Sequence, residues 1–288
     1  TSIGTGCQGM QIDRCQFLTS EGGELAQDRV SVALNANAND VKLRNNRATQ
    51  FRHFAILAGQ NNIVSGNHFF QGDSAPQGVR LAGLALLTTN AASTITGNYV
   101  DNCSIEWTNE RDPEPAYTGG FGFSALSVTD NIFLSGDVAP WFSYLVIKPH
   151  GPGHGLSGLT VTGNVFRSMN GAIDRVERVD TSFADFDYTR MRDVVFEGNT
   201  FHNVVAAVSN PLRVSHTQST VAGAWLVACA PNLPFGGRAR AIDALVPTDR
   251  VRDAGGASVP EMPHADLEQG AGGDEVRLKW TVPVRGRV

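Results

Sequence analysis

The chain has 288 residues and a formal net charge of −5, from 23 Lys and Arg against 28 Asp and Glu. Binding a phosphate backbone needs many basic side chains on one face, so this weakly acidic balance argues against nucleic acid as the main partner. No stretch approaches the roughly 18 consecutive apolar residues of a membrane span, and we therefore expect no membrane insertion.

A short repeat dominates residues 9–205. Its centres are Cys15, Asn46, Asn67, Asn98, Asn131, Asn164 and Asn199. Three places before each centre stands an apolar residue: Ile12, Leu43, Val64, Ile95, Val128, Val161 or Phe196. Two places after it stand Phe17, Ala48, Phe69, Val100, Phe133, Phe166 and Phe201. Strand side chains alternate between faces, so two inward positions of opposite parity require a bend at the centre.

The residue just before each centre supplies a reason for the bend. It is Asn45, Gly66, Gly97, Asp130, Gly163 or Gly198, types that tolerate a left-handed backbone, with Arg14 as the exception. The central Asn side chain can bond the Asn of the next copy. We therefore expect an internal ladder of amides that ends at Cys15.

The centres are separated by 31, 21, 31, 33, 33 and 35 residues, which is typical of a coil with loops of variable length. Apolar stretches at 54–57, 84–87 and 142–147 would form the other faces of each circuit. A β-sandwich also alternates apolar and polar residues, but it does not require the same register in every copy. Together these features resemble the right-handed parallel β-helix of the pectate-lyase-like family, an all-β solenoid.

The repeat stops near residue 220. Residues 224–228, 239–246 and 275–282 read as strands between turns rich in Gly, Pro and Asp. We predict a β-helix over 1–220 and a smaller β-rich module over 221–288, which would serve trimerisation or capping. A solenoid needs caps on its open coils, so we expect the chain to be part of a longer protein.

Function on such a coil is carried by outward side chains and inserted loops. Three polar segments stand out, at 106–117, 148–154 and 174–187, and they would form one groove if their loops stack on one flank. The candidate catalytic residues are Glu106 or Glu110 as acid and Asp174 or Glu177 as base. The candidate glycan-binding residues are Trp107, Asp112, Tyr117, Lys148, His150 and Arg175. The alternative interpretation is a set of solvated loops and surface ion pairs.

We expect neither a metal site nor a cofactor. His150 and His154 have the spacing of helical metal ligands, but Pro152 and the neighbouring glycines do not permit a helix. The cysteines at positions 7, 15, 103 and 229 lack the spacing of a disulfide framework or a zinc site.

The whole pattern, and the segment from Gly158 to Phe201 in particular, is similar to tailspikes and tail fibres of bacteriophages or gene transfer agents of alphaproteobacteria. The resemblance implies a homotrimer in the virion tail or outside the cell, in contact with other tail or virion proteins. Its function would be receptor binding to a cell-surface polysaccharide, with or without cleavage of the glycan. The alternatives are a free secreted polysaccharide lyase or glycoside hydrolase, and a structural spacer that binds no glycan.

Overall fold

The structure is a computed structural model that describes residues 2–4, 6–72 and 78–288. Contacts divide the chain into two compact units, Thr1–Ala207 and Val208–Val288. The first unit is a solenoid and the second is built on an antiparallel sheet. Within the described residues, no helix is long and apolar enough to cross a membrane.

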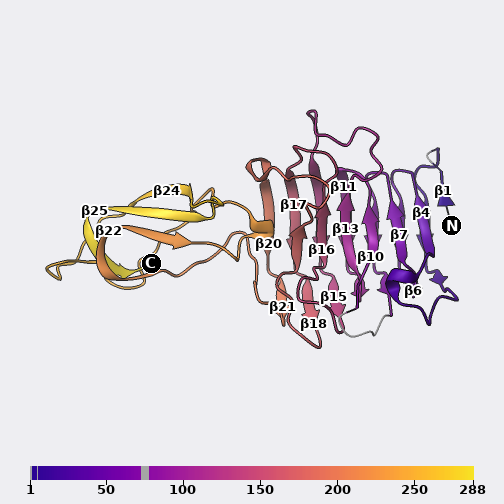
Figure 1. The fold of residues 1–288 in the computed structure, drawn as a ribbon, viewed down its shortest axis with the longest axis horizontal. Helices are drawn as coiled ribbons and strands as arrows, with labels where there is room; N and C mark the ends of the chain where they lie inside the picture. Colours follow the sequence, from indigo (N-terminus) through magenta and orange to yellow (C-terminus); the bar gives the residue numbers. More distant parts are fainter. Residues whose placement is uncertain (1, 5, 73–77) are drawn as a thin grey trace. The chain divides into compact units, whose positions relative to one another are not determined.

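The N-terminal unit is a parallel β-helix, as the repeat predicts. Successive strands enter three sheets in turn, so that each circuit of the chain adds one strand to every sheet (Figure 1). Among the described residues each sheet holds seven strands, and neighbouring strands pair in parallel. The predicted apolar stretches at 54–57, 84–87 and 142–147 supply strands of one of these sheets, which confirms their assignment.

The three sheets are named A, B and C. Sheet A consists of β1 (Ser2–Ile3), β4 (Val32–Ala36), β7 (His53–Leu57), β10 (Ala82–Leu86), β13 (Ser104–Thr108), β16 (Leu145–Lys148) and β19 (Glu177–Val179). Sheet B consists of β2 (Gln11–Asp13), β5 (Lys42–Arg44), β8 (Ile63–Ser65), β11 (Asn90–Thr96), β14 (Phe123–Thr129), β17 (Leu156–Thr162) and β20 (Arg192–Glu197). Sheet C consists of β3 (Gln16–Phe17), β6 (Arg47–Thr49), β9 (His68–Phe70), β12 (Tyr99–Asp101), β15 (Ile132–Ser135), β18 (Val165–Ser168) and β21 (Thr200–His202). The 3-10 helices η1 (Ala26–Asp28) and η2 (Tyr188–Arg190) lie in connections.

The two apolar positions of the repeat form the core on either side of the corner between sheets B and C. Val128 on sheet B and Phe133 on sheet C are both fully buried, although their parity is opposite. The chain turns between them, because all seven residues before the centres have φ between 54° and 69°. Arg14 adopts this left-handed conformation as well, so even the residue type that departs from the pattern makes the same corner.

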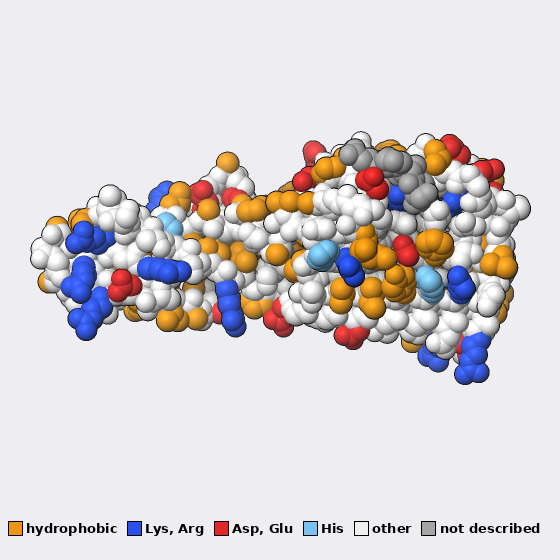
Figure 2. Space-filling view, turned by 90° about the horizontal axis from the view of Figure 1, so that it is seen from below, with side chains coloured by type: hydrophobic (Ala, Val, Ile, Leu, Met, Phe, Trp, Pro, Cys, Tyr) orange, Lys and Arg blue, Asp and Glu red, His pale blue; other side chains and the backbone are white. Residues whose placement is uncertain are grey.

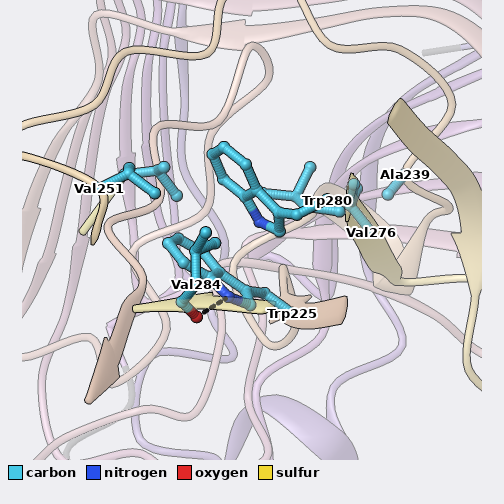
Figure 3. Packing of buried hydrophobic residues seen from close by; sticks show 8 residues of the cluster. Trp225, Ala239, Val251, Val276, Trp280 and Val284 are labelled. Carbon is cyan, nitrogen blue, oxygen red and sulfur yellow. Dashed lines mark hydrogen bonds between the residues drawn. The ribbon is translucent and has the colours of Figure 1, made fainter. Parts of the chain in front are cut away.

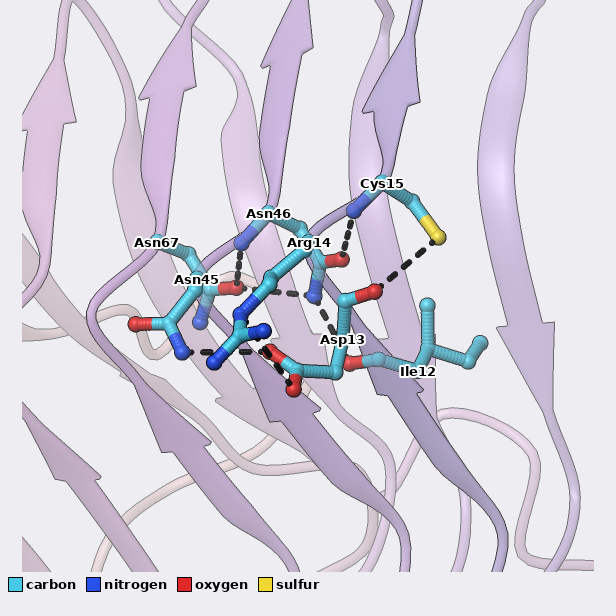
Figure 4. A network of polar contacts seen from close by, with 7 residues as sticks. All are labelled: Ile12, Asp13, Arg14, Cys15, Asn45, Asn46 and Asn67. Atoms are coloured by element: carbon cyan, nitrogen blue, oxygen red, sulfur yellow. Dashed lines mark hydrogen bonds and ion pairs between the residues drawn. The ribbon is translucent and has the colours of Figure 1, made fainter.

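The predicted amide ladder is confirmed. The Oδ1 atom of Asn67 accepts bonds from the backbone nitrogen of Asn46 at 2.9 Å and from its Nδ2 at 3.0 Å (Figure 4). The same Nδ2 donates to the carbonyl of Ile12 at 3.0 Å. The pattern repeats at each centre up to Asn199. At the other end Cys15 contributes only its backbone N–H, which donates to Asn46 Oδ1 at 3.0 Å.

The C-terminal unit folds around two long antiparallel strands, β22 (Thr217–Ala228) and β25 (Glu275–Arg287). The strands β23 (Arg252–Asp253) and β24 (His264–Gln269) also pair with β25. The predicted strands at 224–228 and 275–282 are therefore confirmed. The predicted strand at 239–246 is wrong, because only Ala239 bonds neighbouring backbone and residues 241–244 are exposed without a partner strand. A 3-10 turn, η3 (Pro234–Gly236), precedes this segment.

The core of this unit is a tryptophan pair. The ring centroids of Trp225 and Trp280 lie 5.0 Å apart, and Val251, Val276 and Val284 are buried in the same cluster (Figure 3). The Nε1 of Trp225 donates to the carbonyl of Val284 at 3.2 Å. The buried indole is thus both packed and hydrogen-bonded.

Candidate functional site

Strand alternation places several charged side chains on the outer face of sheet A, at β13, β16 and just after β19. In β13, Ile105 and Trp107 point into the coil and are each 2% exposed, so Glu106 between them points outward. Glu106 is in register with Val146 on β16, and Val146 with Arg178 on β19. Glu106 and Arg178 therefore face outward on either side of Val146, which is apolar and buried.

Two cation–carboxylate contacts and two aromatic rings share this face. Lys148 Nζ lies 3.8 Å from Glu106 Oε1 and 4.9 Å from the ring centre of Phe183. The guanidinium of Arg178 lies 3.9 Å from Asp180 and 5.5 Å from the ring centre of Trp141. The ring of His150 stacks on Phe183 with centroids 4.4 Å apart. The set Glu106, Trp141, Lys148, His150, Arg178, Asp180 and Phe183 is called the outer-A cluster.

The two carboxyl groups of the outer-A cluster have opposite pKa shifts. Burial raises the pKa of Glu106, and the nearby Lys148 offsets only part of this effect. Burial also acts on Asp180, but hydrogen bonds from the hydroxyl and amide of Ser182, together with the cations Arg178 and Lys148, lower its pKa overall. Asp180 Oδ1 accepts those bonds at 2.6 Å and 3.1 Å. One carboxyl is thus biased toward the protonated form and the other toward the ionised form.

Contacts join parts of the three polar segments. The buried side chain of Asn109 bonds the backbone of His150 twice, donating to its carbonyl at 2.9 Å and accepting from its N–H at 2.8 Å. The next connection joins the stack where the N–H of Asp187 donates to the carbonyl of His154 at 2.8 Å. Arg190 covers the ring of Tyr117 at 4.4 Å. Backbone contacts between the loops therefore support the outer-A cluster from the side.

Two of the residues predicted for the site point inward. The indole of Trp107 is buried, and its Nε1 donates to the carbonyl of Thr88 at 2.7 Å, so it offers no ring face to a ligand. Glu177 is fully buried in the inward column of sheet A, where its Oε1 accepts a bond from Arg175 Nε at 3.0 Å. The pair Arg175 and Glu177 packs as a charged unit at the end of the coil.

The structure brings some predicted residues to the cluster and leaves others apart. Glu106, Lys148 and His150 belong to the outer-A cluster, and Glu110 follows β13 with its N–H donating to Thr108 Oγ1 at 3.2 Å. Asp112 and Tyr117 lie in the stacked loops. Asp174 is exposed at the turn before β19, where its N–H donates to the carbonyl of Pro140 at 2.8 Å, and no contact joins its side chain to the described residues of the outer-A cluster.

Residues that the sequence prediction did not select complete the site: Trp141, Arg178, Asp180, Ser182 and Phe183. The signal for Asp180 was its parity, since a residue three places from an inward Glu177 must point outward in an extended strand. That signal becomes visible only when Glu177 is known to be buried.

No protein-family model matches the chain, and a search of curated proteins found no match.

Proposed function

We propose that the chain binds a cell-surface polysaccharide along the outer face of sheet A. The observation that carries the proposal is the outer-A cluster, in which exposed aromatic rings stand beside paired charges. Trp141 is 53% exposed and Phe183 is 60% exposed. Such rings can pack on the apolar faces of sugar rings, while carboxylates and cations bond the hydroxyl groups.

Binding to polysaccharide columns tests this proposal. The full chain is applied to immobilised neutral and acidic polysaccharides, with Trp141→Ala and Phe183→Ala as variants and the exposed Leu18→Ala, on the sheet C side, as the matched control. We expect each aromatic variant to bind about tenfold more weakly, the loss typical of a buried aromatic contact. The proposal would be overturned if no column retained the wild type, or if all variants bound equally well.

We further propose that the chain forms part of a trimeric virion appendage such as a tailspike or tail fibre. The outer face of sheet C supports this, because Tyr99, Ile132 and Val165 lie in register on successive strands. Ile132 is 45% exposed and Val165 is 37% exposed. Figure 2 shows hydrophobic side chains gathered over this sheet. An apolar row of this kind is typical of a surface that another copy covers.

A second candidate function is hydrolysis of the bound glycan, favoured by the opposite pKa shifts of Glu106 and Asp180. Glu106 would donate a proton to the leaving oxygen and Asp180 would activate a water. Asp180 lies two strands away from Glu106 and two residues beyond Arg178, its register partner, so strand geometry sets the backbones about 12 Å apart. Side chains that turn toward each other from this distance can leave room for a water between the carboxyl groups. This arrangement corresponds to an inverting glycoside hydrolase, the alternative to a pure binding protein.

Release of reducing ends from a bound polysaccharide tests hydrolysis. Glu106→Gln and Asp180→Asn should each lower the rate by about a hundredfold or more, because each removes one proton-transfer group. Glu114→Gln, which changes an exposed carboxylate in the loop after β13, is the control. If the wild type releases no sugar, or if the control loses as much as the two variants, hydrolysis by this pair is excluded.

A further inference from the structure

The outward face of the C-terminal sheet carries four arginines on adjacent segments. Val284 and Val288 of the β25 segment are buried, so Arg285 and Arg287 point to the opposite side. Val251 is also buried, and Arg250 and Arg252 flank it. The set Arg250, Arg252, Arg285 and Arg287 is called the arginine face. Figure 2 shows Lys and Arg side chains gathered at the end of this unit.

The strand register sets these like charges side by side. Arg252 on β23 is the direct cross-strand partner of Arg285 on β25. The N–H of Thr248 donates to the carbonyl of Arg287 at 3.0 Å, which brings the segment of Arg250 beside Arg287. Like charges directly opposite one another destabilise a sheet. The isolated chain thus carries a repulsion that a bound anion would relieve.

The neighbouring carboxylates do not neutralise this face. In the part of the chain that the structure describes, none of the four arginines forms an ion pair. Asp249 Oδ1 accepts a bond from the backbone N–H of Arg250 at 2.6 Å, and Asp253 Oδ1 accepts one from Ala257 at 2.9 Å.

The other half of β25 shows the contrast. There the Nζ of Lys279 lies 2.6 Å from Asp266 on the neighbouring β24. In the same unit Arg238 and Arg240 both contact Glu268, at 3.2 Å and 2.8 Å. Lys279, Arg238 and Arg240 are thus paired with carboxylates, and Arg277 on β25 lies in register with Asp266, whereas Arg285 lies in register with another arginine.

We propose that the arginine face binds the sulfate or carboxylate groups of an acidic polysaccharide. Guanidinium groups bind such oxyanions with two parallel hydrogen bonds. The four arginines are distributed over two segments of the sheet, which suits a polymer with repeated charges. Arg250 also lines an open depression formed by residues 247–251 and 258–262. Asp249 and Glu261 line it too, so this depression suits the hydroxyl groups of a sugar ring, and the acidic groups are bound by the arginines outside it. Trp225 and Trp280 are buried, so this face lacks the stacking rings that favour single-stranded nucleic acid.

The test uses the full chain on heparin, which carries sulfates, on alginate, which carries carboxylates, and on neutral dextran. The wild type should be retained by heparin, alginate or both, and not by dextran. The double variant Arg252→Gln/Arg285→Gln should bind about tenfold more weakly at constant salt, since it removes two charge-assisted contacts. The double variant Arg277→Gln/Lys279→Gln removes the same charge from the same sheet and should keep most of the binding.

Thermal unfolding separates a binding role from a structural one. Arg252→Gln/Arg285→Gln should unfold at the same or a higher temperature than the wild type, because the like-charge pair is removed. A lower unfolding temperature, or equal loss of retention in both double variants, would overturn the proposal. Preferential binding of oligo-dT over both acidic polysaccharides would overturn it too. Retention that Arg252→Gln/Arg285→Gln lowers is assigned to the arginine face, and retention that only Phe183→Ala lowers is assigned to the outer face of sheet A, so the two proposals can fail separately.

Discussion

At the corners from Asn46 to Asn164 between sheets B and C, one residue has a left-handed backbone and the next carries a side-chain amide that bonds both neighbouring coils. The left-handed conformation costs an L-residue about 1–2 kcal/mol, so glycine at this place removes a real penalty. Asn45 and Asp130 carry that penalty, and Arg14 carries it as well. The adjacent ladder offsets it by giving every corner amide a partner inside the coil.

Removing one amide from the middle of the ladder should therefore destabilise the protein strongly. Asn131→Ala takes away the acceptor of Asn98, whose backbone nitrogen and Nδ2 each lie 2.9 Å from Asn131 Oδ1. We expect a loss of about 2–4 kcal/mol in the free energy of unfolding, because buried donors are left unsatisfied. Urea denaturation measures it, with the exposed Asn170→Ala as control. Equal midpoints for both variants would contradict the assigned role of the ladder.

The burial of Asp101, on the outer face of sheet C, predicts that the stability of the protein depends on pH. Burial raises its pKa from 3.8 to about 6, so the folded chain retains a proton that the unfolded chain releases at lower pH. The resulting contribution to stability is present below the unfolded pKa and is lost as the pH rises through about 6. In Asp101→Asn the free energy of unfolding should fall less between acidic and neutral pH, as measured by urea denaturation. The exposed Asp185→Asn should leave the slope unchanged, and an unchanged slope in Asp101→Asn would contradict the burial argument.

Among the elements, alternation within a strand decides which side chains reach a site. In β13 it buries Trp107 and exposes Glu106, and after β19 it directs Asp180 outward while Glu177 points inward. In the C-terminal sheet it buries Val284 and turns Arg285 to the surface. The same rule therefore forms the core and selects the residues of both proposed binding surfaces.

The long C-terminal strands give a prediction about their tryptophan pair. Trp225 donates a hydrogen bond to Val284, whereas the buried Nε1 of Trp280 has no hydrogen-bond partner among the described residues. Trp225→Phe should lower the free energy of unfolding by about 1–3 kcal/mol more than Trp280→Phe, because only the first leaves a carbonyl without its donor. Denaturation followed by circular dichroism compares the two. A larger loss in Trp280→Phe would contradict this account of the core.

At the scale of the whole molecule, the proposed appendage requires association of chains through sheet C. Light scattering should give the mass of a trimer for the full chain, and Val165→Lys should shift it toward the monomer by placing a charge in the apolar row. Val195→Lys is a matched control, because Val195 on sheet B is also 37% exposed. A monomeric wild type would contradict the appendage proposal and favour the free enzyme, whose products the reducing-end assay detects.

Local sequence determined the coil. The corner residues, the central Asn and the apolar positions on either side act within a few residues of one another, so their spacing alone predicts the β-helix and its ladder. The repeat also suggested that the loops at 106–117 and 148–154 could stack, and the bonds between Asn109 and His150 join them.

The tertiary structure decided which charged residues face the solvent. Glu177 reads as a surface carboxylate until the closed coil shows it beside Arg175, and only then does the parity of the strand assign Asp180 to the outer-A cluster. The predicted strand at 239–246 is wrong, because backbone pairing with β24 and its turn stops at Ala239 and residues 241–244 are exposed. The arginine face likewise depends on the pairing of Arg252 with Arg285. In each case the deciding partner is remote along the chain, and only the folded register brings it into contact.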